Sequence, residues 1–294
     1  MDYYIAMQKQ FDDTIKQQEI DKVIELVRAN KSQIKLCDDG YWSRAYVVRG
    51  GEFVVKFPKF DFIDYSIEAQ FLNFLNSHKL PIATQKVKWL AQDNSTLVLY
   101  GVKGTALSEL KSLNLAQKSD ITRQLADFLK QLHSLEFNIK TKSLKTEIEN
   151  YKKTYAECSD FFNAHLTKKE KQKLDFLVNE YLPLQRENLG EKLVLCHGDI
   201  WDSNIFVDDK GMVGIIDCAN AGYCDEATDF CFYDKSLRDL LLNHYGASDI
   251  LKRKAELKYA MSVIVSPKYI IEIEDEITAI QKYLPLIKEI IYKY

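Results

Sequence analysis

Apolar and polar residues follow two different periods along this chain, and the change from one period to the other divides it in two. Up to about residue 100, most apolar runs are short and rich in β-branched or aromatic residues. These runs are "SRAYVVR", "EFVVKF", "TQKVKWLAQ" and "STLVLYGV", with turn residues at Gly50-Gly51 and Asp93-Asn94. Alternating runs joined by such turns are typical of antiparallel strands. We therefore expect a small sheet in this part.

Two segments of the first part have the helical period instead. Residues 4 to 27 are amphipathic, and residues 64 to 77 place apolar side chains three and four positions apart. The apolar side chains of the second segment are Ile67, Phe71, Phe74 and Leu75. We expect this helix to bury that side.

From residue 105 the helical period dominates. Residues 116 to 133 carry an apolar stripe made by Leu125, Phe128, Leu129 and Leu132. Helical patterns continue over residues 145 to 173 and on to 184, and again from 225 to 294, with one short hairpin between them. We expect an α+β, two-lobe fold: a β-rich N-terminal lobe (1–100), a connector (101–104) and a mainly helical C-terminal lobe (105–294).

Composition argues against several classes of protein: nucleic-acid-binding, membrane and secreted proteins. The net charge of −3 gives no basic excess, so we expect neither nucleic acid nor a membrane as partner. No run reaches the length of about 18 apolar residues that a membrane helix needs. The first residues lack the apolar core of a secretory signal, and the six cysteines form no CxxC pair. We expect a reduced, cytoplasmic protein that is a monomer or a weak dimer.

The hairpin "VLCHGDIWDSNIFVDDKGMVGIID" carries the clearest chemistry in the sequence. Asn204 and Asp217 offer the oxygen ligands that Mg²⁺ prefers, and Asp199 is left to accept a proton. A catalytic Asp, an Asn after four intervening residues and a later metal-binding Asp form the kinase pattern. The alternative is a polar hairpin with ordinary Asp and Asn turn residues. The ordered set, flanked by apolar strands, favours a site for phosphoryl transfer.

A kinase also needs a cation for the phosphates of its nucleotide, usually a Lys on a strand held by a helical Glu. Lys56 lies within the apolar run "EFVVKF", and Glu68 follows in the predicted helix. The alternative places Lys56 on an edge strand facing solvent, with Glu68 on an exposed helix face. A Lys among apolar neighbours is unusual unless it is paired. The kinase-like hairpin of the other lobe is a second reason to favour the paired arrangement of Lys56 and Glu68.

The remaining nucleotide contacts are predicted from the turn before Lys56 and from the connector. Backbone N–H groups between Gly40 and Ser43 would meet the phosphates. The stretch that leads into the connector, with Leu99, Tyr100 and Val102, would offer a backbone donor and acceptor to a purine edge.

These residues together resemble a known family. "HGDIWDSNIFVDDKGMVGIID" followed by "CDEATDF" is similar to the aminoglycoside phosphotransferases, a branch of the protein-kinase-like fold. "FVVKFPK", "LADFLKQLHSL" and "LLNHY" are particularly similar to the 2″-phosphotransferases of this family. The resemblance implies a small-molecule kinase with ATP or GTP as donor and Mg²⁺ as cofactor. It also implies these roles: Asp199 as catalytic base, Asn204 and Asp217 as metal ligands, Lys56 on the phosphates with Glu68 as its partner, and Asp229 as a structural support of the catalytic loop. We expect His197 to be a second structural support of this loop.

The acceptor is less well defined than the kinase core. The 2″-enzymes carry a long acidic segment after the residue that matches Asp229, whereas this chain has only Asp234 and Asp239 before "NHY". An acidic run at 272–276 could substitute for it in binding a polycation, but a solvated helix face is the interpretation that we favour for this run. The resemblance still makes an aminoglycoside, and with it antibiotic resistance, the first expectation for the small-molecule hydroxyl acceptor. Choline, a sugar, a fructosamine or homoserine are the alternatives.

Two other functions remain open on sequence grounds. A metal-dependent phosphohydrolase would use the same carboxylates with water as nucleophile, but it usually needs a second cluster of metal ligands. We expect the other histidines, His133 among them, to be isolated. A nucleotide-binding protein without catalysis would not need a base, metal ligands and a phosphate-binding Lys together.

Overall fold

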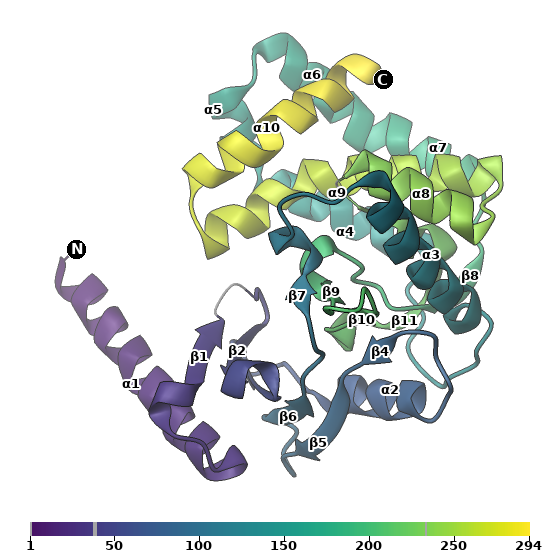
Figure 1. Cartoon of the computed structure of the whole chain (residues 1–294). Coiled ribbons are helices and arrows are strands. Elements are labelled where there is room, and N and C mark those ends of the chain that lie inside the picture. Colours follow the sequence, from purple (N-terminus) through teal and green to yellow (C-terminus); the bar gives the residue numbers. More distant parts are fainter. Residues whose placement is uncertain (1, 38–39, 233) are drawn as a thin grey trace. The chain divides into compact units, whose positions relative to one another are not determined.

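The computed structural model describes residues 2–37, 40–232 and 234–294. The chain divides into two compact units (Figure 1). Unit 1 comprises Met1–Ser77 and Thr84–Lys103, and unit 2 comprises His78–Ala83 and Gly104–Tyr294. A sheet dominates the first unit and helices dominate the second, which confirms the α+β class expected from the sequence.

Unit 1 is built on an antiparallel sheet with the strand order β1-β2-β3-β6-β5. The strands are β1 (Ile34–Cys37), β2 (Ser43–Val48), β3 (Phe53–Pro58), β5 (Lys86–Leu90) and β6 (Leu97–Tyr100). Gly50 and Gly51 turn the chain between β2 and β3 with φ of 64° and 99°, where a Cβ would be strained. The hairpin predicted at this glycine pair is confirmed.

Two helices cover the sheet of unit 1: α1 (Asp2–Val27) and α2 (Ser66–Asn76). Val23 and Val27 of α1 pack with Tyr46 of β2 and Val55 of β3 in one cluster. The buried residues of α2 are Glu68, Ala69, Phe71, Leu72 and Leu75.

Burial along α2 corrects one detail of the sequence prediction. Ile67 is 48% exposed, so its predicted place on the buried side is wrong. The buried stripe passes instead through Glu68, whose carboxylate reaches Lys56 in the sheet. Because residues next to each other on a helix face different directions, turning Glu68 inward turns Ile67 outward.

Unit 2 is mainly helical. Its helices are α3 (Leu115–Leu132), α4 (Leu144–Glu157), α5 (Ser159–His165), α6 (Lys168–Phe176), α7 (Leu182–Asn188), α8 (Lys235–Tyr245), α9 (Asp249–Ile273) and α10 (Glu276–Lys293). The stripe predicted on α3 is confirmed, since Leu125, Phe128, Leu129 and Leu132 are all fully buried. In the described part of the chain, no helix combines the length and the apolar character that crossing a membrane requires.

The helical pattern after residue 145 is more broken than the sequence suggested. Helix α5 ends before Leu166, whose backbone is extended. Thr167 then caps the start of α6 through a capping box with Glu170. Helix α9 packs against α4 and α10 (Figure 1). Its buried Leu257 and Ile264 lie in the core that these helices share.

The strands of unit 2 form two sheets, where the sequence predicted one hairpin. One sheet pairs β8 (Leu193–Cys196) with β11 (Gly222–Asp225). The other has the order β4-β10-β9-β7, and its strands are β4 (Ala83–Thr84, beginning in unit 2), β7 (Thr105–Ala106), β9 (Ile205–Val207) and β10 (Val213–Ile215). A hairpin is present within the motif, between β9 and β10, but β8 lies outside it because it pairs with β11, beyond β10. The pairing of β8 with β11 ends at Cys196, so the His-Gly-Asp loop begins at the next residue.

Candidate active site

The three polar residues of the sequence motif lie at strand ends within unit 2. Asp199 follows β8, Asn204 directly precedes β9, and Asp217 follows β10. The backbone N–H of Ile216 donates to the carbonyl oxygen of Asn204 at 3.0 Å, so the hairpin end holds Asn204 beside the chain that leads to Asp217. Antiparallel pairing of β9 and β10 thus gathers residues that are far apart in sequence.

Hydrogen bonds orient both oxygens of the Asp199 carboxylate. Trp201 donates its indole N–H to Oδ1 at 2.9 Å. Asn204 donates its amide N–H₂ to Oδ2 at 3.1 Å and to the Asp199 backbone oxygen at 3.0 Å. Trp201 was not singled out from the sequence, where only its position next to the motif could have indicated it. Because the amide nitrogen of Asn204 faces Asp199, its amide oxygen is the atom left for a cation.

The carboxyl of Asp199 is electrostatically tuned. Burial, followed by repulsion from the Asp217 charge, raises its pKa to about 7. Hydrogen bonds from Trp201 and Asn204 and the positive charge of Lys142 act in the opposite direction. A carboxyl that titrates near neutral pH is suited to accept a proton and to release it again.

Asp217 has an unusual backbone. Its φ of 64° and ψ of 71° place it in the left-handed region, at the start of the short helical turn Cys218–Asn220. A residue with a Cβ is strained there, and such strain often marks functional positions. Its charge acts on both Asp199 and His197, so the motif concentrates negative charge at this end of the hairpin.

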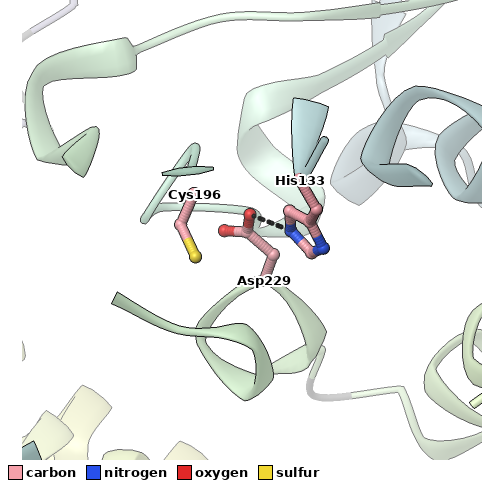
Figure 2. Close-up of side chains that lie close together, drawn as sticks. All are labelled: His133, Cys196 and Asp229. Atoms are coloured by element: carbon pink, nitrogen blue, oxygen red, sulfur yellow. Dashed lines mark hydrogen bonds and ion pairs between the residues drawn. The ribbon is translucent and has the colours of Figure 1, made fainter. Parts of the chain in front are cut away.

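Asp229 supports the loop from below (Figure 2). It is fully buried in the turn Glu226–Phe230, and its carboxylate accepts the backbone N–H groups of His197 (3.0 Å) and Gly198 (2.8 Å). Burial alone would raise the pKa of Asp229, but the hydrogen bond and charge of His133 hold this pKa below its usual value. The Nε2 of His133 lies 3.1 Å from Oδ2.

His133 corrects the expectation that the other histidines are isolated. It follows the buried stripe of α3, and its Nδ1 also lies 2.9 Å from the hydroxyl of Tyr245. His165 and His244 likewise have partners, Glu276 and Ser119. His197 is fully buried and its Nδ1 accepts the N–H of Asp199 at 3.3 Å, while burial lowers its pKa, so a neutral ring supports the loop.

His133, Cys196 and Asp229 form the one group of possible metal ligands found among the described residues, with ligand atoms within 4.8 Å (Figure 2). Burial raises the pKa of Cys196 well above its usual value, which keeps the thiol protonated. Both oxygens of Asp229 already accept hydrogen bonds. The cluster is therefore a structural core of the loop and not the second metal cluster that a phosphohydrolase would need.

Gly198 and Lys142 show how tightly the loop is enclosed. Gly198 has φ of 84°, and a Cβ there would lie 2.2 Å from the carbonyl oxygen of Asn220. The ammonium of Lys142 donates to that same oxygen at 2.8 Å. Lys142 was missed by sequence reasoning, since it precedes α4 far from the motif, and only the tertiary structure brings its charge near Asp199.

In unit 1, Lys56 and Glu68 form the predicted pair. The ammonium donates to both carboxylate oxygens at 2.8 Å, and the residues are only 7% and 2% exposed. Lys56 lies on β3, between β2 and β6, so the alternative of a solvent-facing edge strand is wrong. A buried Lys held this way has a fixed position, because displacing it would leave a buried carboxylate unpaired.

The predicted phosphate loop is only partly within the described residues. Asp38 and Asp39 lie outside them, while Gly40 and Ser43 lie inside. A Cβ at Gly40 would lie 2.8 Å from the carbonyl oxygen of Ser43, so the chain turns closely there. The hydroxyl of Ser43, at the start of β2, accepts a hydrogen bond from Tyr65 at 2.7 Å.

The connector residues differ in what they can offer. Leu99 and Tyr100 belong to β6, which pairs with β3 on one side and β5 on the other. Gly101 donates its N–H to the carbonyl oxygen of Glu52 at 3.1 Å. Val102 is the predicted residue that follows this ladder, so it is the connector position best suited to offer backbone groups to a base.

The acidic residues considered for a cationic acceptor are engaged within unit 2. Asp234 caps α8 and pairs with Lys118, and Asp239 pairs with Lys235. In the acidic run, Glu272 pairs with Lys268, Asp275 caps α10 and Glu276 pairs with His165. These carboxylates stabilise helix ends and helix surfaces.

A family model described as "Phosphotransferase enzyme family" matches residues 33–239 of the chain. Two curated aminoglycoside 3′-phosphotransferases match a shorter stretch. The one from Acinetobacter baumannii is 41% identical over 63 residues, and the one from Enterococcus faecalis is 43% identical over 56 residues. These alignments cover 20% and 19% of this chain, and 24% and 21% of the two relatives, so the chain matches under a quarter of their length.

Solved structures match over nearly the whole chain. The GDP and kanamycin complex of APH(2″)-IIIa has a TM-score of 0.71 at 17% identity, covering 92% of this chain and 99% of that one. The gentamicin complex of APH(2″)-IIa has a TM-score of 0.69 at 18% identity, covering 94% and 96%. The macrolide 2′-phosphotransferase MphH from Brachybacterium faecium has a TM-score of 0.59 at 15% identity, covering 92% and 98%. At these identities the comparison establishes the fold, and it confirms the protein-kinase-like architecture.

Proposed function

The chain belongs to the phosphotransferase enzyme family, and from this premise we propose that it is a small-molecule kinase. It transfers the γ-phosphate of a magnesium-bound nucleoside triphosphate to a hydroxyl group of a small acceptor. The observation that supports this most directly is the Asp199 carboxylate, which is oriented by Trp201 and Asn204 and titrates near neutral pH. The buried Lys56–Glu68 pair of unit 1 supplies the cation that such a reaction needs.

Each of these residues has a part in the transfer. Asp199 accepts the proton of the acceptor hydroxyl while the hydroxyl oxygen attacks the γ-phosphorus, the bond from that phosphorus to the β,γ-bridging oxygen breaks, and the nucleoside diphosphate leaves. The hydrogen bonds to both carboxylate oxygens fix the orientation of Asp199. Lys56, fixed by Glu68, neutralises charge on the nucleotide phosphates. Asp229 keeps the loop in shape by accepting the N–H groups of His197 and Gly198.

The residues at the hairpin end fit a magnesium ion. Asn204 and Asp217 would hold it, because an amide oxygen and a carboxylate are the hard ligands that Mg²⁺ takes. The carboxylates of Asp217 and Asp199 repel each other, and a divalent cation would offset this excess of negative charge. When bound, the ion would neutralise charge on the phosphates.

The donor is ATP or GTP, and the acceptor considered first is an aminoglycoside. Structural neighbours were solved with GDP, ATP or ADP, and with gentamicin, kanamycin or streptomycin. The purine is expected at the connector, with Val102 offering its backbone groups, and the phosphates near Lys56 and the segment from Gly40 to Ser43.

A second candidate is an acceptor that carries fewer positive charges. The ion pairs of Asp234, Asp239 and Glu272 with lysines favour it, because a polycation needs carboxylates that are not already paired with a cation. The likeness to a macrolide 2′-phosphotransferase shows that the same fold occurs in a protein named for a different class of acceptor.

The test is consumption of Mg-ATP and Mg-GTP with a panel of acceptors. The panel contains kanamycin, gentamicin, a macrolide, choline and neutral sugars, and a reaction without acceptor measures hydrolysis. We expect acceptor-dependent turnover that Asp199→Asn reduces by a factor of about 10² or more, as loss of a general base does. Equal turnover by the variant and the wild type would refute the role of Asp199, and turnover that needs no acceptor would indicate a hydrolase.

A further inference from the structure

The start of α2 makes two separate contacts with the sheet of unit 1, one from its first turn and one from its N-cap residue Tyr65. Glu68 binds the ammonium of Lys56 on β3. One helical turn earlier, the hydroxyl of Tyr65 donates to the hydroxyl oxygen of Ser43 on β2 at 2.7 Å. Residues three positions apart lie on the same face of a helix, so one turn of α2 touches two neighbouring strands.

Strand register explains why these two contacts belong together. Lys56 pairs directly with Ala45, and Ser43 lies two residues before Ala45 on the same strand. Side chains two apart on a strand, and those directly opposite each other on neighbouring strands, point to the same face of a sheet. Ser43 and Lys56 therefore share one face, whereas Tyr46 packs with α1 on the other face.

Tyr65 fills the space beside both of these residues. It is 2% exposed, and the ammonium of Lys56 lies 5.5 Å from the centre of its ring. Its N–H also donates to the carbonyl oxygen of Asn94, which anchors the start of the helix. A buried phenol hydroxyl that donates to Ser43 fixes the position of the serine oxygen and leaves the serine O–H to donate elsewhere.

We propose that Tyr65 is a positioning residue for the nucleotide phosphates: by holding Ser43, it presents the serine hydroxyl and the Lys56 ammonium to the same phosphate chain. This inference rests on the proposed function, because it assumes that the ligand of unit 1 is a nucleoside triphosphate. Tyr65 acts through Ser43 and through the packing of its ring beside Lys56. The same helical turn therefore sets the positions of both groups that meet the phosphates.

The experiment measures binding of Mg-ATP and Mg-GTP to the full chain by calorimetry, for wild type and Tyr65→Phe. We expect the variant to bind the preferred nucleotide about fivefold more weakly, the effect of losing one ordinary hydrogen bond. Tyr46→Phe is the matched control, because it removes another buried tyrosine hydroxyl of unit 1, one that donates to Glu19 at 2.7 Å. The control should leave the affinity within about twofold, since its hydrogen bond lies on the opposite face.

A double-mutant cycle tests whether the hydroxyl acts through Ser43. Ser43→Ala should weaken binding at least as much as Tyr65→Phe, and the double variant should be no weaker than Ser43→Ala alone. If the wild type binds nucleotide and Tyr65→Phe binds equally well, or if the two losses multiply, the positioning role is wrong. If the wild type binds neither nucleotide, the proposed function itself is wrong, and this inference with it.

Discussion

Replacing Asp229 by asparagine should both destabilise unit 2 and deform the loop that contains His197 and Gly198. The carboxylate accepts one hydrogen bond at Oδ1, from Gly198, and two at Oδ2, from His197 and His133. An asparagine has one acceptor oxygen, so its NH₂ group must face at least one of these N–H donors. The change keeps the shape of the side chain and removes its charge in a fully buried place.

The size of the effect follows from these contacts. A hydrogen bond to a charged group contributes about 1.5–3 kcal/mol, and a buried donor left without a partner costs about 1–3 kcal/mol. We therefore expect Asp229→Asn to lower the free energy of unfolding by about 3–5 kcal/mol and the melting temperature by roughly 10 °C. Asp234→Asn is the control, since asparagine also caps helices well and the ion pair with Lys118 is partly exposed, so we expect a loss under about 1 kcal/mol.

Urea unfolding at several pH values tests the charge as well as the contacts. Because the folded pKa of Asp229 lies below its usual value, its contribution to stability is complete above the unfolded pKa of about 3.9. That contribution is lost as the pH falls through the folded pKa. The stability gap between wild type and Asp229→Asn should therefore stay constant above about pH 5 and narrow only below about pH 4. A gap above about pH 5 that is no larger than that of Asp234→Asn would refute this account of the loop.

Two further changes test the electrostatics of the two units. Lys56→Met should lower the free energy of unfolding by about 3 kcal/mol, measured by urea unfolding, because it takes the Lys56 ammonium away from the buried Glu68 carboxylate; an unchanged transition midpoint would contradict the pairing. Lys142→Met should raise the pKa of Asp199, measured by carboxyl NMR titration of the magnesium-free protein, because the charge of Lys142 lowers that pKa; a fall or no change would show that this charge does not act on Asp199.

Much of the fold follows from local patterns in the sequence. The glycine pair at the β2–β3 turn needs positive φ, and the stripe on α3 is buried as its spacing requires. Two predictions failed because they depended on contacts between distant segments. Ile67 is exposed because Glu68 turns inward to Lys56, and β8 pairs with β11, not within the motif hairpin.

The sequence by itself determined which chemical groups stand at the candidate site. The spacing of Asp199, Asn204 and Asp217 between apolar runs already predicted a phosphoryl-transfer motif, because each of these residues stands at the end of a strand-like run. Tertiary structure alone decided what surrounds them. Lys142 near Asp199, His133 against Asp229 and Tyr65 beside Ser43 come from segments distant in sequence. No local period specifies such contacts, since they arise only when separate helices and strands pack together.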